Sequence, residues 1–214
     1  MLEVINQGLE TSVQDYPGRV GYLNQGFPPS GPMDSWSFRL ANLLVSNDES
    51  EGALECQYTG PTLKFEKDQV VAICGADMQP KVNGKSVPMW ESILIKADQT
   101  LELGFSLNGA RSYISFAGGI ESNPWLGSKS TFHKAGVGGI DGHAIKKGQK
   151  ISIGQSATRP GRKVREECIP DIHNSGVWEI EVVRGPNDDW LDDDGYEIFL
   201  NAEWKLQARS DRTG

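Results

Sequence analysis

The feature that most constrains the fold of this chain is the shortness of its apolar runs. Short or alternating apolar runs dominate, and 25 glycines and 11 prolines help to punctuate the 214 residues. Apolar runs bounded by turn residues are typical of β-strands. We therefore expect an all-β fold with strands at these ranges: Leu2–Asn6, Thr62–Phe65, Gln69–Cys74, Ile93–Lys96, Thr100–Phe105, Arg111–Phe116 and Lys150–Ile153.

Two local signals add a hairpin and one early helix to this pattern. Asn83-Gly84 lies between two short strand-like segments, and both residue types tolerate the positive φ angles of a tight hairpin. Asp34 is a candidate helix cap, and helical spacing after it predicts an apolar stripe that faces the core, formed by Trp36, Leu40, Leu43 and Leu44. Asn42 and Asn47 are expected to have structural roles.

The sequence predicts a β-rich first domain over residues 1–154, a polar linker over 155–176 and a partial second domain over 177–214. The second domain begins with a β run at Val177–Val183. The acidic stretch 187–195 lacks the spacing of a calcium-binding loop, because Trp190 would occupy its first ligand position. We interpret this stretch as the solvated start of a short acidic helix.

Composition argues against several classes of function. The net charge of −8 disfavours nucleic acid as a partner, and no apolar run approaches the roughly 18 residues of a membrane span. No secretory signal is visible at the N-terminus, so a cytoplasmic location is expected. The three cysteines lack C-x-x-C spacing and are expected to be buried or incidental thiols. The three histidines are scattered, and no metal site is expected.

The segment from Glu10 to Asp34 is unusually rich in specified polar groups for a connection between elements. It contains two turns punctuated by proline and glycine, with Gln14, Asp15 and Arg19 close together. A connector needs only solubility, whereas a binding loop needs particular side chains. We expect this loop to fold back toward Arg111 and Gly118-Gly119 and to form a concave polar site.

Several motifs in order along the chain resemble one family. The string "VQDYPGRVGY…PPSGPMDS" resembles the biotin-dependent carboxyltransferase family, which contains KipA, the C subunit of 5-oxoprolinase, allophanate hydrolase subunit 2-like proteins and the carboxyltransferase region of urea carboxylase. The urea carboxylase branch is the most similar. The other motifs in family order are Arg39–Asn47, Ala53-Leu54-Glu55, Gly75-Ala76-Asp77, Gly109–Tyr113, Ala117–Ile120, Leu126–Thr131, Gly136–Gly139 and Leu206–Gly214.

The resemblance implies a site that transfers a carboxyl group from carboxybiotin to urea or a similar amide. The biotin would be carried by a partner domain or protein, a biotin carboxylase would perform the ATP-dependent step, and a KipI-like (allophanate hydrolase subunit 1-like) partner is expected. In this family the second domain resembles a cyclophilin-like barrel and continues for roughly a hundred residues after Ser-Asp-Arg-x-Gly, so the chain is expected to hold only its opening.

Carboxyl transfer requires a base and donors that stabilise a developing oxyanion. The candidate catalytic residues are Arg111, Lys134 and Asp34. The candidate substrate-binding residues are Gln14, Asp15, Arg19, Ser30, Gly118, Gly119, Ser128 and Ser130. Structural alternatives remain open, because Asp15 and Arg19 can pair across their own turn and Asp34 can simply cap the helix.

A second class of function also remains open. A protein like KipA or like the C subunit of 5-oxoprolinase would act with a KipI-like partner as a binding and regulatory module, or in the hydrolysis of 5-oxoproline. The sequence has no nucleophile elbow, Walker loop or dinucleotide fingerprint. ATP hydrolysis by the chain alone is therefore not expected.

Overall fold

A computed structural model describes residues 1–172 and 179–205 of the chain. The chain divides into two compact units, residues 1–174 and 175–214. Each unit is described by itself below. No helix in the described ranges is long and apolar enough to cross a membrane.

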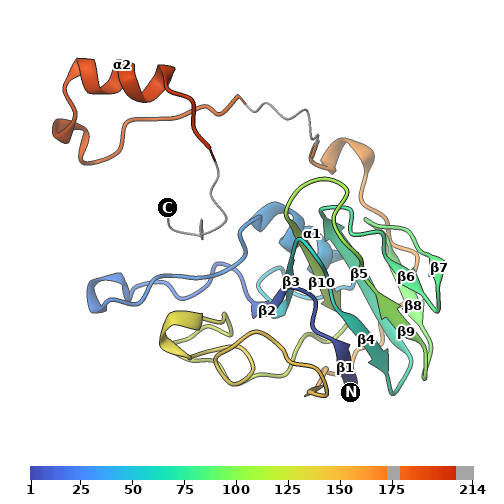
Figure 1. The fold of residues 1–214 in the computed structure, drawn as a ribbon. Helices are drawn as coiled ribbons and strands as arrows, with labels where there is room; N and C mark the ends of the chain where they lie inside the picture. The colour runs from blue at the N-terminus through green and yellow to red at the C-terminus, as the bar shows by residue number, and fades with distance from the viewer. Residues whose placement is uncertain (173–178, 206–214) are drawn as a thin grey trace. The chain divides into compact units, whose positions relative to one another are not determined.

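The first unit is built from two antiparallel sheets (Figure 1). The six-stranded sheet has the order β11-β1-β4-β9-β6-β7, with β11 at Lys150–Ile151, β1 at Leu2–Asn6, β4 at Thr62–Phe65, β9 at Thr100–Glu102, β6 at Lys81–Val82 and β7 at Lys85–Ser86. The five-stranded sheet has the order β2-β3-β10-β5-β8, with β2 at Glu10–Gln14, β3 at Ala53–Gln57, β10 at Arg111–Phe116, β5 at Gln69–Gly75 and β8 at Ser92–Ile95. The mainly β prediction is confirmed.

The main hydrophobic core lies between the two sheets. Leu2 and Val4 of β1 contribute to it, as do Leu54 and Cys56 of β3. Side chains alternate between the two faces of a strand, so Glu55, between those two β3 residues, points to the opposite face. Burial raises the pKa of the Cys56 thiol, which therefore behaves as a small apolar side chain.

A second apolar layer packs helix α1, Ser35–Leu44, onto the outer face of the five-stranded sheet (Figure 1). The Asp34 side chain caps this helix by accepting a hydrogen bond from Ser37 N at 3.0 Å, as the sequence predicts. Phe38 is fully buried, and its ring meets the ring of Tyr113 edge to face, with centroids 5.7 Å apart.

The predicted apolar stripe of α1 is wrong in two of its four positions. Trp36 and Leu43 are 49% and 45% exposed, whereas Leu44 is buried. The buried face instead follows Phe38 and Ala41. Small and polar residues share this face, so apolar spacing alone gave the wrong rotation of the helix. The Trp36 indole donates to the carbonyl oxygen of Cys168 at 2.8 Å.

Strands β1, β4 and β10 have their predicted bounds, and β5, β8, β9 and β11 differ from theirs by one to three residues at an end. The predicted hairpin joins β6 and β7, with positive φ at both turn residues, 48° at Asn83 and 78° at Gly84. Strands β2 and β3 were not predicted. Both mix polar and apolar residues; β3 lies between β2 and β10, and β2 forms one edge of the sheet.

Residues 155–172, predicted as a linker, are part of the first unit and pack on the rest of it. Val164 N donates to the Trp90 carbonyl at 2.9 Å, and Lys163 forms an isolated antiparallel bridge with Glu91. The remaining turns of this unit include the 3-10 helices Leu23–Gln25, His133–Ala135 and Glu166–Cys168. The domain boundaries drawn from the sequence stay a prediction.

The described part of the second unit contains a 3-10 turn, Asp188–Trp190, and helix α2, Asp193–Asn201. The acidic helix start is confirmed, since the Asp192 side chain accepts from Gly195 N at 2.8 Å. The predicted β run 177–183 is wrong in its described part, 179–183, which forms no strand because no described segment pairs with it. Residues 206–214 lie outside the described ranges, so the cyclophilin-like second domain stays a prediction.

We predict that Phe38→Ala destabilises the chain by about 3–5 kcal/mol, because it opens a cavity between α1 and the sheet. Leu43→Ala, on the exposed side of the same helix, should change stability by no more than about 0.5 kcal/mol. Urea denaturation of the two variants measures the difference. Equal losses would mean that the helix packs through the apolar stripe read from the sequence.

Candidate functional site

The register of the five-stranded sheet gathers polar side chains on the face that α1 covers in part. Glu55 of β3 pairs with Ser12 of β2 on one side and with Tyr113 of β10 on the other. Partners in an antiparallel sheet point to the same face, and α1 packs on the β5 and β10 side. We call this set the polar face; it consists of Ser12, Gln14, Glu55, Arg111 and Tyr113.

Glu55 is the central group of the polar face. Its side chain is 5% exposed, and its Oε2 accepts hydrogen bonds from Met33 N at 2.7 Å and from the Tyr113 hydroxyl at 3.0 Å. Arg111 Nε lies 3.7 Å from Glu55 Oε1. A buried carboxylate is stable only when it is hydrogen-bonded and paired with a cation, and Glu55 meets both conditions.

Tyr113 connects Glu55 to the start of α1. Its hydroxyl donates to Glu55 and accepts from Asp34 N at 2.7 Å. Burial raises the pKa of Tyr113, and the negative charge of Glu55 raises it further. The phenol therefore remains protonated and keeps donating to the carboxylate.

A second cluster fixes the start of the loop 16–33, which we call the polar loop. The Asp15 carboxylate accepts from Ser128 Oγ at 2.6 Å, from Lys129 N at 2.6 Å and from Ser130 Oγ at 2.5 Å. Asp15 N in turn donates to Ser130 Oγ at 3.0 Å. Segment 128–130 is 113 or more residues away in sequence, so Asp15 holds two distant loops together.

Arg19 is an unusually buried cation, at 1% exposure. Its Nη2 donates to the Ser130 carbonyl at 2.8 Å, its Nε donates to the Trp125 carbonyl at 3.2 Å, and its guanidinium lies 4.7 Å from the centroid of the Trp125 ring. Burial lowers the pKa of Arg19, and the Asp15 carboxylate opposes that shift. Among the described residues, Arg19 Nη1 is buried with no hydrogen-bond partner.

Gln14 is a second buried group with an unused polar atom. It is 1% exposed, and its Nε2 donates to Ser12 Oγ at 3.0 Å. Its Oε1 is buried without a hydrogen-bond partner in the described part of the chain. Such atoms cost stability unless a small molecule or a ligand satisfies them.

The structure therefore brings the predicted residues into two groups. Asp15, Arg19, Ser128 and Ser130 form one; Gln14 and Arg111 belong to the other, the polar face, where Asp34 N donates to the Tyr113 hydroxyl. The side chains of Asp15 and Arg19 both make their hydrogen bonds to the segment 125–130 instead of bonding each other across their own turn. The Asp34 carboxylate serves α1 as a cap, because both of its oxygens accept from Ser37.

The remaining predicted residues lie apart from these groups. Gly118 N donates to Asn47 Oδ1 at 2.9 Å and Gly119 N donates to the Phe116 carbonyl at 2.8 Å. Both N–H groups are thus already used inside the fold, and Asn47 has the structural role expected of it. Lys134 lies in an exposed 3-10 turn beside His133, whose Nε2 is 3.2 Å from Glu10 Oε1. Ser30 is half-buried in the loop, with φ of 56°.

Sequence reasoning assigned no role to Glu55 or Tyr113. A signal was present, because Glu55 stands between Leu54 and Cys56 in a run that otherwise reads as a buried strand. An acid in such a position is rarely buried without a partner. The partner is Tyr113, on a strand 58 residues away in sequence, and only the fold reveals that pairing.

Comparisons with known proteins identify relatives of the chain. Residues 25–214 match the family model "Carboxyltransferase domain, subdomain A and B". The chain is 36% identical to urea amidolyase of Saccharomyces cerevisiae, over 100% of this chain and 12% of that protein. It is 34% identical to the C subunit of 5-oxoprolinase from Escherichia coli, over 100% of this chain and 67% of that protein.

The fold is also similar to solved structures. Urea carboxylase of Kluyveromyces lactis superposes with a TM-score of 0.92 at 36% identity, covering 98% of this chain and 20% of that one. Urea amidolyase of the same organism gives a TM-score of 0.91 at 37% identity, covering 98% of this chain and 13% of that one. The chain thus spans only a small part of these larger proteins.

Tyr113 should make stability depend on alkaline pH. Because its pKa is raised in the folded state, the folded chain keeps a proton that the unfolded chain loses above about pH 10. This contribution is fully present below that pH and declines as the pH rises, by up to about 1.4 kcal/mol per pH unit. Tyr113→Phe should be less stable at neutral pH and should lose stability less steeply above about pH 10.

Denaturant unfolding at a series of pH values measures this dependence, with Tyr22→Phe, a substitution in the polar loop, as the matched control. Parallel alkaline profiles for wild type and Tyr113→Phe would contradict the buried, protonated Tyr113.

Proposed function

Because the chain belongs to the family of carboxyltransferase domains, subdomains A and B, we propose that it forms a site for carboxyl transfer from carboxybiotin to an amide nitrogen. The observation that carries this proposal is the polar face. One face of one sheet holds a buried carboxylate at Glu55, a guanidinium at Arg111 and an unsatisfied amide oxygen at Gln14.

Each of these groups suits one part of the reaction. A carboxylated biotin supplies an activated carboxyl group. The planar guanidinium of Arg111 matches the geometry of a carboxylate and would hold that group while negative charge develops. Glu55 fixes the orientation of Arg111, because the Glu55 carboxylate is itself held by Met33 N and the Tyr113 hydroxyl.

The acceptor is an amide, with N–H donors and a carbonyl acceptor on one small group. Gln14 Oε1, on the polar face, would accept from the amide N–H, and Arg19 Nη1, in the cluster around Asp15, is a second proposed substrate contact. Both atoms are buried and lack a hydrogen-bond partner in the described chain. A substrate with matching groups gains the hydrogen bonds that these atoms lack, and an analogue without them would leave the atoms unpaired.

Access to this face requires the polar loop to open. The loop is attached at Asp15 through Ser128 and Ser130 and returns over Glu55 at Met33. Gln14 and Glu55 are buried beneath this connection. We propose that the loop 16–33 moves to admit the amide and closes to exclude water, as lids do in many enzymes.

Urea is the favoured acceptor, because relatives of this chain include urea amidolyase and proteins described as urea carboxylase. The carboxyl carrier would be biotin on a partner protein or domain, loaded by a biotin carboxylase. A KipI-like protein or domain would complete the assembly. Lys134, in an exposed turn, is a proposed contact for the acidic or carboxylated groups of this assembly.

A 5-oxoprolinase-type role is the second candidate. The observation that favours it is the 34% identity to the C subunit of 5-oxoprolinase from Escherichia coli over 100% of this chain. In that case the same buried amide-binding atoms would receive the lactam of 5-oxoproline, and a KipI-like partner would again be required. Dependence on biotin distinguishes the two candidates.

We predict that Arg111→Ala lowers carboxyl transfer by about two to three decades, because a positioned charge is lost where the carboxylate develops. The assay is urea-dependent carboxylation by the full-length protein reconstituted with biotin carboxylase and its carrier. Carboxylation of biotin itself should be unchanged in the same variant.

Arg165→Ala is the matched control, since the Arg165 side chain is 79% exposed and pairs with Glu167 at the surface. A transfer rate for Arg111→Ala within about threefold of wild type would reject the site, given the losses expected at such positions. Full-length protein that shows no dependence on biotin would reject the proposed reaction.

A further inference from the structure

Trp125 contacts the polar loop at two of its residues. The Trp125 carbonyl oxygen accepts from Arg19 Nε at 3.2 Å, and the centroid of its ring lies 4.7 Å from the guanidinium carbon of Arg19. The same ring meets the ring of Phe27 edge to face, with centroids 4.8 Å apart. Figure 1 shows the loop, in blue, extending from the sheets of the first unit. One side chain on the segment that follows β10 thus contacts both sides of this loop.

The turn that carries Trp125 is held in a specific conformation. Trp125 N donates to the Ser128 carbonyl at 2.8 Å, and Ser128 N donates back at 3.2 Å. The two residues between them have positive φ, 49° at Leu126 and 77° at Gly127, as in a tight hairpin turn. Leucine rarely adopts this conformation, which persists only where the surrounding structure holds it. The turn therefore keeps Trp125 beside Ser128, whose hydroxyl donates to Asp15.

The two sides of the polar loop are joined to each other near its base. Arg19 N donates to the Pro29 carbonyl at 2.6 Å. The backbones at Gly18 and Gly31 pass so closely that a Cβ atom on Gly18 would collide with the Pro29 carbonyl oxygen and lie 3.0 Å from Gly31 N. Because the sides are joined, we expect the loop to move as one body. The two residues that contact Trp125 would then leave it together.

Trp125 also fixes the direction of the Arg19 side chain. Arg19 Nε and Nη2 lie on one edge of a planar, rigid guanidinium. They donate to the carbonyl oxygens of Trp125 and Ser130, so that edge is fully engaged. Nη1 lies off that edge, buried and without a hydrogen-bond partner among the described residues. The direction in which Nη1 can donate therefore depends on the carbonyl group and the ring of Trp125.

We propose that Trp125 is a positioning residue that orients Arg19 Nη1 for the substrate and, with Phe27, holds the polar loop closed. The orientation of Arg19 toward an amide rests on the proposed function, whereas the closure of the loop does not. Trp125 acts through Arg19 and the loop and is assigned no contact with the reacting atoms. A cation on an aromatic ring gains most where water is excluded, as it is at the buried Arg19.

Amide hydrogen exchange of the 214-residue chain, followed by NMR, tests the closure without any reaction. Met33 N donates to Glu55 in the closed loop and reports opening. Ile114, in β10 with a strand on each side, reports unfolding of the sheet. We expect Trp125→Leu to speed the exchange of Met33 by about tenfold, because an aromatic pair and a cation–π contact are lost. The exchange of Ile114 should not change.

Two further variants separate the ring from the bulk of the side chain. Trp125→Phe keeps an aromatic ring and the carbonyl group, so Met33 should exchange within about threefold of its wild-type rate. Trp190→Leu is the matched control, since Trp190 belongs to the second unit and is 79% exposed. Unchanged exchange of Met33 in Trp125→Leu would overturn the proposal. Equal acceleration of Met33 and Ile114 would also overturn it, because Trp125 would then stabilise the whole unit.

The positioning role is tested by steady-state kinetics in the reconstituted complex with full-length protein. A contact made equally in the ground state and the transition state affects KM and leaves kcat unchanged. We expect Trp125→Leu to raise the KM for urea by about tenfold with kcat within about threefold of wild type, and Trp125→Phe to restore the KM. A lower kcat with an unchanged KM would contradict the orientation of Arg19 by Trp125.

The two measurements distinguish failure of this inference from failure of the proposed function. Faster exchange of Met33 in Trp125→Leu, in a protein that shows no carboxyl transfer, would support closure by Trp125. It would reject the reaction and, with it, the orientation of Arg19 toward an amide. Carboxyl transfer by the wild type together with unchanged exchange of Met33 in Trp125→Leu would support the reaction and reject the closure.

Discussion

The buried carboxylate of Glu55 is the interaction on which the site depends. A charge at 5% exposure is costly unless its neighbours satisfy it. Here Met33 N from the polar loop, the Tyr113 hydroxyl from β10 and the Arg111 guanidinium all converge on it. Because these partners come from separate parts of the chain, the one carboxylate fixes the loop, the helix start and the cation in a single arrangement.

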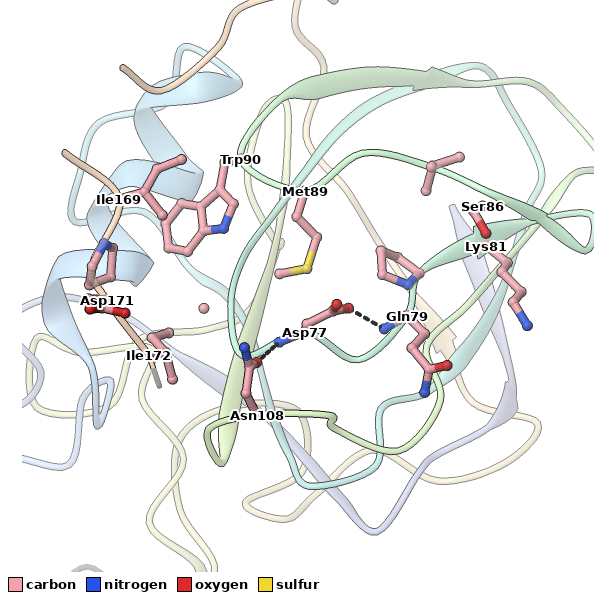
Figure 2. A pocket seen from close by; sticks show the side chains of 14 residues that line it. Asp77, Gln79, Lys81, Ser86, Met89, Trp90, Asn108, Ile169, Asp171 and Ile172 are labelled. Atoms are coloured by element: carbon pink, nitrogen blue, oxygen red, sulfur yellow. Dashed lines mark hydrogen bonds between the residues drawn. The ribbon is translucent and has the colours of Figure 1, made fainter. Parts of the chain in front are cut away.

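The layers of the first unit explain why this arrangement is possible. The core between the two sheets takes one face of β3, and α1 covers only the β5 and β10 side of the other face. Polar side chains occupy the β2 side of that face. Asp15 holds the polar loop above them, because its carboxylate accepts hydrogen bonds from Ser128 and Ser130. A cavity lined by Met89, Trp90 and Ile172 lies at the adjoining end of β5, and Gly75 belongs both to that strand and to the cavity lining (Figure 2).

The sequence predicted the parts of this structure that depend on local signals. The β1, β4 and β10 strands, the Asn83-Gly84 hairpin and the Asp34 cap follow from alternation, turn chemistry and capping. Strands β2 and β3 were not predicted, because their polar residues pair with groups that are distant in the sequence. The partnership of Asp15 with Ser128 and Ser130 was not derivable either, although all three were candidate site residues. The cavity beside β5 is lined by residues between Gly75 and Ile172 that only the fold brings together.

We propose that the polar face performs carboxyl transfer and that Glu55 organises it. The most direct measurement is a single-turnover transfer of labelled carboxyl from a carrier already carboxylated on biotin to urea, which bypasses the ATP-dependent step. We expect rapid, urea-dependent transfer by the full-length protein and a loss of about two decades or more in Glu55→Gln, which keeps the shape and removes the charge. Equal transfer by wild type and Glu55→Gln, with both proteins folded, would contradict it.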